Sequence, residues 1–238
     1  MNTIAIIPAR GGSKGIPKKN IIDFCGHPLI AWTIACCRRS RQINGIFVST
    51  DSPEIAAVAR RYGAEVIARP AELATDTADS ESALIHALDI IESGGRKPVD
   101  AVLFLQATSP LRETAVVERA LAKFEKEKLD SLFSAAELES FFMWREERGR
   151  LQSWNYDFHN RKRRQDVLKE ARQYVETGSF YIMRPQLLRE TRNRLGGTIG
   201  VWLVPLWKNF EIDVPEDVHI CEQFMKLHGL DQCPPQPL

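Results

Sequence analysis

The chain opens with "TIAIIPARGGSKGIPKKN" (residues 3–20), in which a β-branched apolar run leads directly into a loop rich in glycine and lysine. The run is continuous rather than alternating, which is typical of a strand buried on both faces of a parallel sheet. Glycines in the loop expose backbone N–H groups and let an anion approach closely. Three lysines add positive charge, and a serine and an asparagine add directional hydrogen bonds. The stretch predicts an α/β fold with a polyphosphate-binding loop after its first strand.

This loop matches neither of two common phosphate-binding signatures. It lacks the order G-x-x-x-x-G-K-[ST] of P-loops and the order G-x-G-x-x-G of dinucleotide-binding folds. A tight turn that carries surface lysines is therefore an alternative interpretation.

Strand-like and helix-like segments alternate over the first 128 residues, which favours a mostly parallel sheet covered by helices on both faces, a three-layer Rossmann-like arrangement. Ligands bind such sheets at the carboxyl ends of the strands, so the polar strand exits that begin at Arg10, Asp51, Arg69 and Gln106 should share one edge. The expected strands are 3–9, 45–51, 64–70 and 100–110, and the expected helices are 28–39, 52–63, 79–95 and 113–128.

The alternation stops after about residue 134. Residues from about 135 to 175 are aromatic, charged and irregular, which indicates an insertion with an extended arm, although core packing is favoured for its Phe141, Phe142 and Trp144. Two more strands (178–183 and 198–205) and a helix (214–229) complete a single domain of 238 residues. The proline-rich end, "LDQCPPQPL", is expected to be loose.

Composition excludes several classes of protein. A formal net charge of +1 gives no global field for nucleic acid or an acidic membrane. The five cysteines form no C-x-x-C pair, which argues against a disulfide framework or a zinc site and fits a reducing compartment. No secretory signal or membrane-spanning apolar stretch is visible. We expect a cytoplasmic protein that binds neither nucleic acid nor membrane.

Seven segments in a fixed order resemble the acylneuraminate cytidylyltransferases, the CMP-N-acetylneuraminic acid synthetases, along nearly the whole chain. One such motif alone would be weak, whereas their shared order is specific. The segments are "IIPARGGSKGIPKKN" (6–20), "VSTD" (48–51), "ARPAELATDTADSESALIHAL" (68–88), "LQATSPLR" (105–112), "RKRRQD" (161–166), "ETGSFYI" (176–182) and "FEIDVPED" (210–217).

The resemblance implies a nucleotidyltransferase that moves CMP from CTP to the anomeric hydroxyl of a sialic acid and releases pyrophosphate. It also implies Mg²⁺, or Mn²⁺ in its place, and a homodimer that uses the insertion for dimerisation and sugar binding. Arg10 and Lys19 would act in catalysis by stabilising charge on the leaving pyrophosphate. The loop residues implied to bind nucleotide and phosphates are Arg10, Ser13, Lys14, Lys19 and Asn20.

Three residues at other strand exits are implied to bind substrate. Arg69 would contact CTP, with a surface ion pair as the alternative. Ser80 would contact the nucleotide, although a helix N-cap is an equally good role for it. Gln106 can serve the sugar acid or the nucleotide because an amide both donates and accepts hydrogen bonds; a polar strand end is the alternative.

Two carboxylates in "FEIDVPED" are the metal candidates, since Mg²⁺ is usually held by one or two carboxylates together with substrate oxygens. Asp213 is the first. The family often shows D-x-D here, and Glu211 replaces the other aspartate, so its direct coordination is open. Asp217 falls in the first turn of a helix, where capping is expected.

The basic run that starts at Arg161 matches the family's "R-x-R-R-Q-D". The resemblance places Arg161 at the reacting centre as a catalytic residue, with Arg164 and Gln165 as substrate-binding neighbours. Taken alone, such a run is more often solvated or part of a nucleic-acid patch.

Alternatives for the function remain open at this stage. The acceptor could be legionaminate, pseudaminate or deaminated sialic acid, although the "RRQD" and "ETGSFY" segments are more similar to the acetylneuraminate branch than to the pseudaminate branch. A non-catalytic nucleotide-binding domain is a second possibility, and a nucleic-acid-binding protein built on the basic run is a third.

Overall fold

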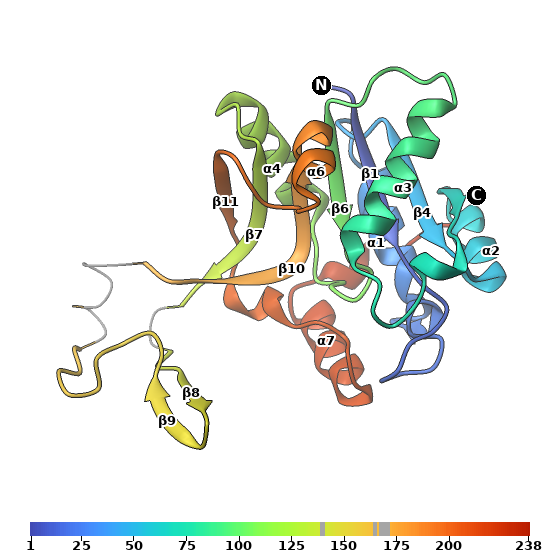
Figure 1. Cartoon of the computed structure of the whole chain (residues 1–238). Coiled ribbons are helices and arrows are strands. Elements are labelled where there is room, and N and C mark those ends of the chain that lie inside the picture. Colours follow the sequence, from blue (N-terminus) through green and yellow to red (C-terminus); the bar gives the residue numbers. More distant parts are fainter. Residues whose placement is uncertain (139–140, 164–165, 167–171) are drawn as a thin grey trace.

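A seven-stranded sheet in the order β11-β7-β10-β6-β1-β4-β5 organises the chain (Figure 1). The computed structural model describes residues 1–138, 141–163, 166 and 172–238. Neighbouring strands are parallel except that β10 runs antiparallel to both β6 and β7. The strands are β1 (Thr3–Pro8), β4 (Gly45–Thr50), β5 (Glu65–Ala68), β6 (Ala101–Leu105), β7 (Ser131–Glu137), β10 (Tyr174–Met183) and β11 (Ile199–Leu203).

The apolar opening run forms β1, which lies between β6 and β4. Ile4 to Ile7 are almost completely buried, because side chains on both faces of this strand are covered by helices. The prediction of a mostly parallel α/β sheet with a doubly buried first strand is confirmed.

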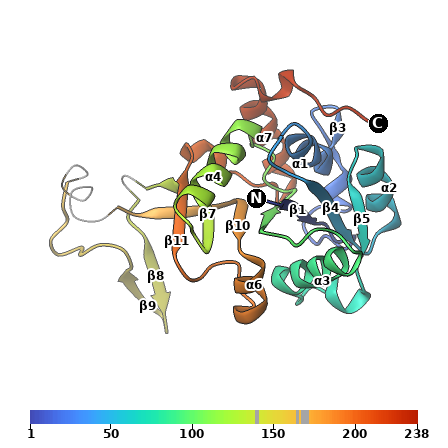
Figure 2. The ribbon, with the colours of Figure 1, turned by 90° about the horizontal axis from the view of Figure 1, so that it is seen from above.

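Helices cover both faces of the sheet (Figure 2). On one face lie α1 (Leu29–Arg38), α2 (Pro53–Arg61) and α4 (Thr114–Lys126), and on the other lie α3 (Ser80–Ser93) and α6 (Pro185–Thr191). A third apolar cluster joins α7 (Pro215–Leu227) to α1 and to the loop after β1 through Ile16, Leu29 and Ile212. Shorter elements are β2 (Asp23–Phe24), β3 (His27–Pro28), η1 (Lys19–Ile21), η2 (Ala71–Leu73), η3 (Leu206–Asn209) and η4 (Leu230–Gln232).

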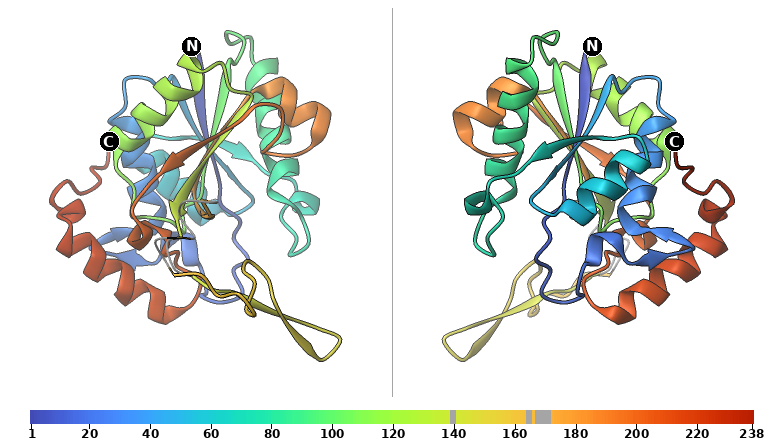
Figure 3. Two further views of the ribbon diagram at one scale, coloured as in Figure 1. Left: turned by 90° about the vertical axis from the view of Figure 1, so that its left-hand side faces the viewer. Right: turned by 90° about the vertical axis from the view of Figure 1, so that its right-hand side faces the viewer.

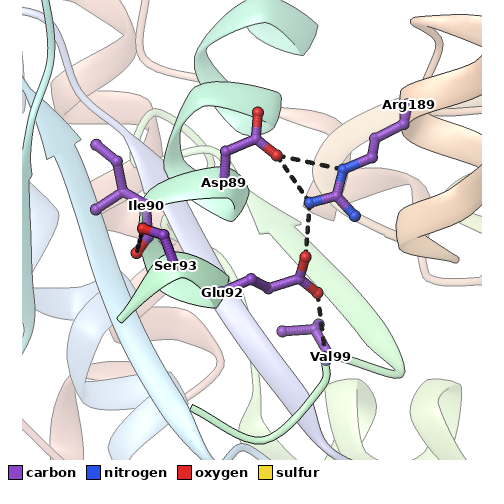
Figure 4. A network of polar contacts seen from close by, with 6 residues as sticks. All are labelled: Asp89, Ile90, Glu92, Ser93, Val99 and Arg189. Carbon is purple, nitrogen blue, oxygen red and sulfur yellow. Dashed lines mark hydrogen bonds and ion pairs between the residues drawn. The ribbon is translucent and has the colours of Figure 1, made fainter. Parts of the chain in front are cut away.

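Helix α6 was not expected from the sequence, and polar contacts join it to α3. Arg189 Nη2 lies 2.8 Å from Asp89 Oδ1 and 2.7 Å from Glu92 Oε2 (Figure 4). The other oxygen of Glu92 accepts a hydrogen bond from the Val99 backbone N–H at 3.4 Å. These contacts join α3, α6 and the segment before β6 at the margin of the sheet away from the strand exits.

The insertion forms an arm that projects from the rest of the domain (Figures 1 and 3). Strands β8 (Trp144–Glu147) and β9 (Arg150–Ser153) pair as a hairpin. Its two-residue turn has φ of 52° at Arg148 and 73° at Gly149, as tight hairpin turns require. Phe141 and Trp144 are 50% and 47% exposed, so the core packing favoured for them is wrong. The ring of Trp144 instead contacts Tyr156 and Phe158, which belong to the same arm.

The proline-rich end is not loose, which corrects the expectation from its composition. The Leu238 N–H donates to the Arg61 carbonyl oxygen at 2.8 Å, and Arg38 Nη1 donates to the Gln236 carbonyl oxygen at 2.7 Å. Arg39 Nη2 donates to the carbonyl oxygen of Cys233 at 2.6 Å. Proline-rich backbone has few N–H groups but keeps every carbonyl, and these arginines use those carbonyls. In the part of the chain that the structure describes, no helix is both long and apolar enough to cross a membrane.

Candidate functional site

A polar cavity of about 460 Å³ lies at the strand exits of the central sheet. The loop after β1, the exits of β5 and β6, the start of α3 and the loop before α7 all contribute to its wall. Among the residues predicted from the sequence, its lining includes Arg10, Ser13, Lys14, Lys19, Asn20, Arg69, Ser80, Gln106 and Asp213.

Contacts to two neighbouring segments and one contact within the loop hold the loop after β1 in place. The Gly11 N–H donates to Asp51 Oδ1 at 2.9 Å, and the buried Asn20 amide donates to the Arg10 carbonyl oxygen at 3.1 Å. Gly15 packs against the Asp213 backbone so closely that a Cβ on residue 15 would collide with the Asp213 carbonyl oxygen. The absence of a side chain at Gly15 therefore lets the loop lie against the loop before α7.

The cations of this loop face internal carboxylates. Lys19 Nζ lies 2.8 Å from Asp213 Oδ1, and only 15% of the lysine side chain is exposed. Arg10 Nη1 donates to the Thr75 carbonyl oxygen at 2.6 Å and lies 3.0 Å from Asp76 Oδ1. Lys14 Nζ lies 2.9 Å from the other oxygen of Asp76.

Asp76 was not singled out from the sequence, because nothing in "LATDTADSE" distinguishes one acid from another. The hydrogen bond from Lys14 and the charge of Arg10 hold the pKa of the Asp76 carboxyl below its usual range. An anion that binds Arg10 and Lys14 must therefore compete with a carboxylate already there.

Arg69 is buried, and the surface ion pair considered for it is wrong. Its Nε donates to Ser49 Oγ at 3.1 Å and its Nη2 donates to the Ser49 carbonyl oxygen at 2.5 Å. Burial lowers the pKa of the guanidinium, although an arginine stays charged in this situation. The side chain thus presents a largely desolvated positive charge to the cavity wall.

Helix α3 begins at the cavity, and its cap is Asp79 rather than Ser80. The Ser82 N–H donates to Asp79 Oδ1 at 2.6 Å, so Asp79 supplies the N-cap oxygen. Ser80 is the first helical residue and lines the cavity. The capping role considered for Ser80 is therefore wrong, and its binding to the nucleotide stays a prediction.

The two candidate metal ligands differ in environment. The Asp213 side chain is 68% exposed and lines the cavity, while Asp217 Oδ2 accepts from the N–H groups of Asp213 at 2.8 Å and Val214 at 2.9 Å. The capping role predicted for Asp217 is thereby confirmed. Glu211 is mostly buried; its Oε1 accepts from Ser109 Oγ at 3.2 Å, and burial raises the pKa of its carboxyl.

Neither carboxylate belongs to a preformed metal cluster. Among the described residues, no group of three or more His, Cys, Asp or Glu side chains is arranged to hold a metal ion. A hard cation at Asp213 would therefore need oxygens from a substrate to complete its coordination.

Arg161 lies on the arm and does not line the cavity of its own chain. Its guanidinium stacks over the ring of Phe142 at 4.3 Å and lies 5.9 Å from the ring centre of Tyr156. Arg164 and Gln165, the substrate-binding neighbours proposed from the sequence, fall outside the described residues.

The comparisons with known proteins agree with this arrangement. Residues 4–227 match the family model described as "Cytidylyltransferase". A pseudaminic acid cytidylyltransferase of Campylobacter jejuni is 33% identical over 234 residues, which cover 96% of this chain and 98% of that protein. An N-acylneuraminate cytidylyltransferase of Oncorhynchus mykiss is 36% identical over 225 residues, covering 92% of this chain. The chain spans about half (49%) of that fish relative's length.

Solved structures agree on the fold. CMP:2-keto-3-deoxy-manno-octonic acid synthetase complexed with CTP has a TM-score of 0.68 at 17% identity, covering 96% of this chain and 100% of the other. A 4-diphosphocytidyl-2C-methyl-D-erythritol synthase also has a TM-score of 0.68, at 12% identity, with 94% and 98% of the two chains covered. At these identities the likeness establishes the nucleotidyltransferase fold and nothing finer.

The Asp76 contacts predict that Asp76→Asn tightens polyphosphate binding. The variant keeps the side-chain volume but removes a carboxylate that an incoming anion must displace and that repels it. We expect the affinity for inorganic tripolyphosphate to rise about two- to fivefold, as for the loss of a competing exposed ion pair. Isothermal titration calorimetry at fixed ionic strength measures this.

The matched control is Glu54→Gln. Glu54 pairs with Lys18 of the same loop at 2.8 Å, but neither residue lines the cavity. The affinity of the Glu54→Gln variant for tripolyphosphate should equal that of the parent protein. Unchanged or weaker binding in Asp76→Asn contradicts the competition between carboxylate and phosphate.

Proposed function

Since this chain belongs to the cytidylyltransferase family of nucleotidyltransferases, we propose that it transfers CMP from CTP to the anomeric hydroxyl of a nine-carbon keto-sugar acid and releases pyrophosphate. The observation that carries this proposal is the cavity at the strand exits, in which Lys19 faces Asp213 while Arg10 and Lys14 pair with Asp76. The cations and the carboxylate together suit a triphosphate with a bound divalent ion, and a simple turn would need neither.

The acceptor in this proposal is a sialic acid. Relatives named for N-acylneuraminate and for pseudaminic acid match at 36% and 33% identity, so overall similarity does not separate the two. The "RRQD" and "ETGSFY" segments favour N-acylneuraminate, and pseudaminate, legionaminate and deaminated sialic acid are the acceptors to test against it.

The loop after β1 would hold the triphosphate and stabilise charge that builds on the leaving pyrophosphate. Arg10 and Lys14 would release the Asp76 carboxylate and bind phosphate oxygens in its place. Lys19 is mostly buried, and a cation shielded from water interacts more strongly with developing charge. Asp51 and Asn20 hold the loop backbone at Gly11 and Arg10, so this part of the loop would need little reorganisation during the reaction.

A divalent ion, Mg²⁺ or Mn²⁺, fits Asp213 better than Glu211. Asp213 presents a mostly exposed carboxylate to the cavity, as a hard cation shared with phosphate oxygens requires. The Glu211 carboxylate accepts from Ser109 and lies against Gly178. When bound, the ion would neutralise charge on the phosphates; Asp213 would hold it, and Lys19 would then turn to the triphosphate.

The arm would complete the site in a homodimer. Arg161 cannot act on a substrate in the cavity of its own chain while it stacks on Phe142, and the exposed aromatic residues of the arm suit burial against a second copy. We therefore propose that each arm brings Arg161 to the partner's cavity. There its planar guanidinium would hold a phosphate or carboxylate through two parallel hydrogen bonds.

A cytoplasmic location completes the proposal. All five cysteines are unpaired thiols, and Cys36, Cys37 and Cys221 are buried as small apolar residues. Free thiols of this kind fit a reducing compartment.

Pyrophosphate release tests the proposal. The purified protein is incubated with CTP, Mg²⁺ and a panel of nonulosonates, with ATP and UTP as control donors. We expect release with CTP and N-acetylneuraminate above all other pairs. Binding of CTP without release on any acceptor would refute transferase activity, and preference for another nonulosonate would reassign the acceptor alone.

Asp213→Asn should abolish most Mg²⁺-dependent turnover, because it removes a negative charge beside a hard cation while keeping the side-chain shape. Glu211→Gln should be milder, since the Glu211 carboxylate is bound to Ser109. Initial rates over a Mg²⁺ titration measure both effects. If Asp213→Asn matches the parent at limiting Mg²⁺, Asp213 does not hold the metal.

Arg161→Lys should lower kcat about tens- to thousands-fold although the charge is kept, because lysine cannot form the paired hydrogen bonds. Arg163→Lys is the control, since Arg163 pairs with Asp166 on the arm at 2.7 Å. Mixing Arg161→Ala with Asp213→Ala should restore about a quarter of the parental rate, since half of randomly mixed dimers hold one intact site. Equal losses in Arg161→Lys and Arg163→Lys, or no recovery on mixing, argue against an arm shared between copies.

A further inference from the structure

Arg112 is a buried cation without a carboxylate partner among the described residues. It is 8% exposed, and within the described part of the chain it donates hydrogen bonds to uncharged oxygens. Burial lowers the pKa of its guanidinium. The nearby Glu211 carboxylate interacts with this charge but forms no direct ion pair with it. Burying a charge without a directly paired counter-charge opposes folding, so stability alone does not account for an arginine at this position.

The four hydrogen bonds of Arg112 join three elements. Nη1 donates to Thr33 Oγ1 on α1 at 3.1 Å, and Nη2 donates to the Gln106 carbonyl oxygen at the exit of β6 at 2.9 Å. Nε and Nη2 donate to Ser179 of β10, at 3.0 Å to its hydroxyl and 2.5 Å to its carbonyl oxygen. The planar fork of a guanidinium spans these positions, whereas the compact ammonium of lysine cannot reach them together.

Arg112 thereby fixes both ends of a second contact, between Gln106 and Gly178. Gln106 Nε2 lies 2.8 Å from the Gly178 carbonyl oxygen, and Gly178 directly precedes Ser179. A carbonyl oxygen can only accept a hydrogen bond, so the amide end that faces it must be the NH₂ group. The amide oxygen, Oε1, is therefore the end that Gln106 offers to the cavity it lines.

Gly178 makes this orientation possible. Its φ is +61°, and a Cβ there would collide with both Gln106 Nε2 and Glu211 Oε1. The backbone can present its carbonyl to Gln106 only because residue 178 has no side chain.

We propose that Arg112 is a positioning residue that holds Gln106 with Oε1 ready to accept a hydrogen bond from a hydroxyl or N–H group of the bound substrate. The inference rests on the proposed transferase function and deepens it. Arg10, Lys14 and Lys19 can only donate, and they suit phosphates. Gln106 supplies a neutral acceptor for an O–H or N–H group of the sugar or the nucleoside, and those cations cannot accept a hydrogen bond from such a group.

A double-mutant cycle tests this coupling. Arg112→Lys and Gln106→Ala should each lower kcat/KM for one substrate about tenfold, the effect of losing one hydrogen bond that the transition state retains. Adding Arg112→Lys to Gln106→Ala should lower kcat/KM no further, because Arg112 acts through the amide that is already gone. Additive losses overturn the proposal.

Arg184→Lys is the matched control. Arg184 also holds backbone carbonyls, those of Leu129 and Asp100 at 3.2 Å each, but it does not line the cavity or contact Gln106. The melting temperature of the Arg184→Lys variant should fall, while its kcat/KM should equal that of the parent protein. A similar loss of kcat/KM in this variant would show that Arg112 matters through stability alone.

Gln106→Glu keeps the inference testable if Arg112→Lys does not fold. This variant retains an accepting oxygen but sets a second oxygen against the Gly178 carbonyl, so the orientation is lost and kcat/KM should fall at least about tenfold. Parental kcat/KM in Gln106→Glu refutes the orientation. Because every variant is compared with an active parent, an inactive parent reports on the proposed function and not on Arg112.

Discussion

The contact between Lys19 and Asp213 joins residues 194 positions apart, and the site depends on it. It brings the loop after β1 against the loop before α7, and Gly15 allows the two backbones to touch. Positive charge gathered in a loop without a ligand must be balanced, and Asp213 and Asp76 provide that balance here. Internal ion pairs therefore engage the cations of this cavity, and an anionic ligand would have to replace them.

Local signals in the sequence were sufficient for the parallel part of the fold. The continuous apolar run of β1, the Ser52 cap of α2 and the alternation of strands and helices all depend on neighbouring residues. The position of β10 between β6 and β7 depends on antiparallel pairing between residues that are tens of positions apart, and such pairing leaves no local pattern in the sequence. The docking of the chain's end on Arg38 and Arg39 was missed for the same reason.

Some residues of the candidate site could likewise be predicted from the sequence, and others could not. Residues at strand exits, such as Arg10, Arg69 and Gln106, could be predicted to gather because the exits of parallel strands share one edge. Asp76 could not be predicted, because its role depends on how the loop before α3 folds over the loop after β1. Arg112 was missed because its importance comes from three elements that meet only in the folded chain.

Two buried arginines with uncharged partners, Arg69 and Arg112, stand close to a cavity that already holds Arg10, Lys14 and Lys19. The carboxylates of Asp76 and Asp213 offset part of this positive charge, and both are substantially exposed. Buried charges are screened less by solvent than exposed ones, so the positive potential should persist in the cavity. A triphosphate and a sugar acid, which repel each other in water, can be held together only where such a potential exists. The buried arginines therefore lower the free energy of bringing two anions to one place, while Gln106 adds the selectivity that charge alone does not supply.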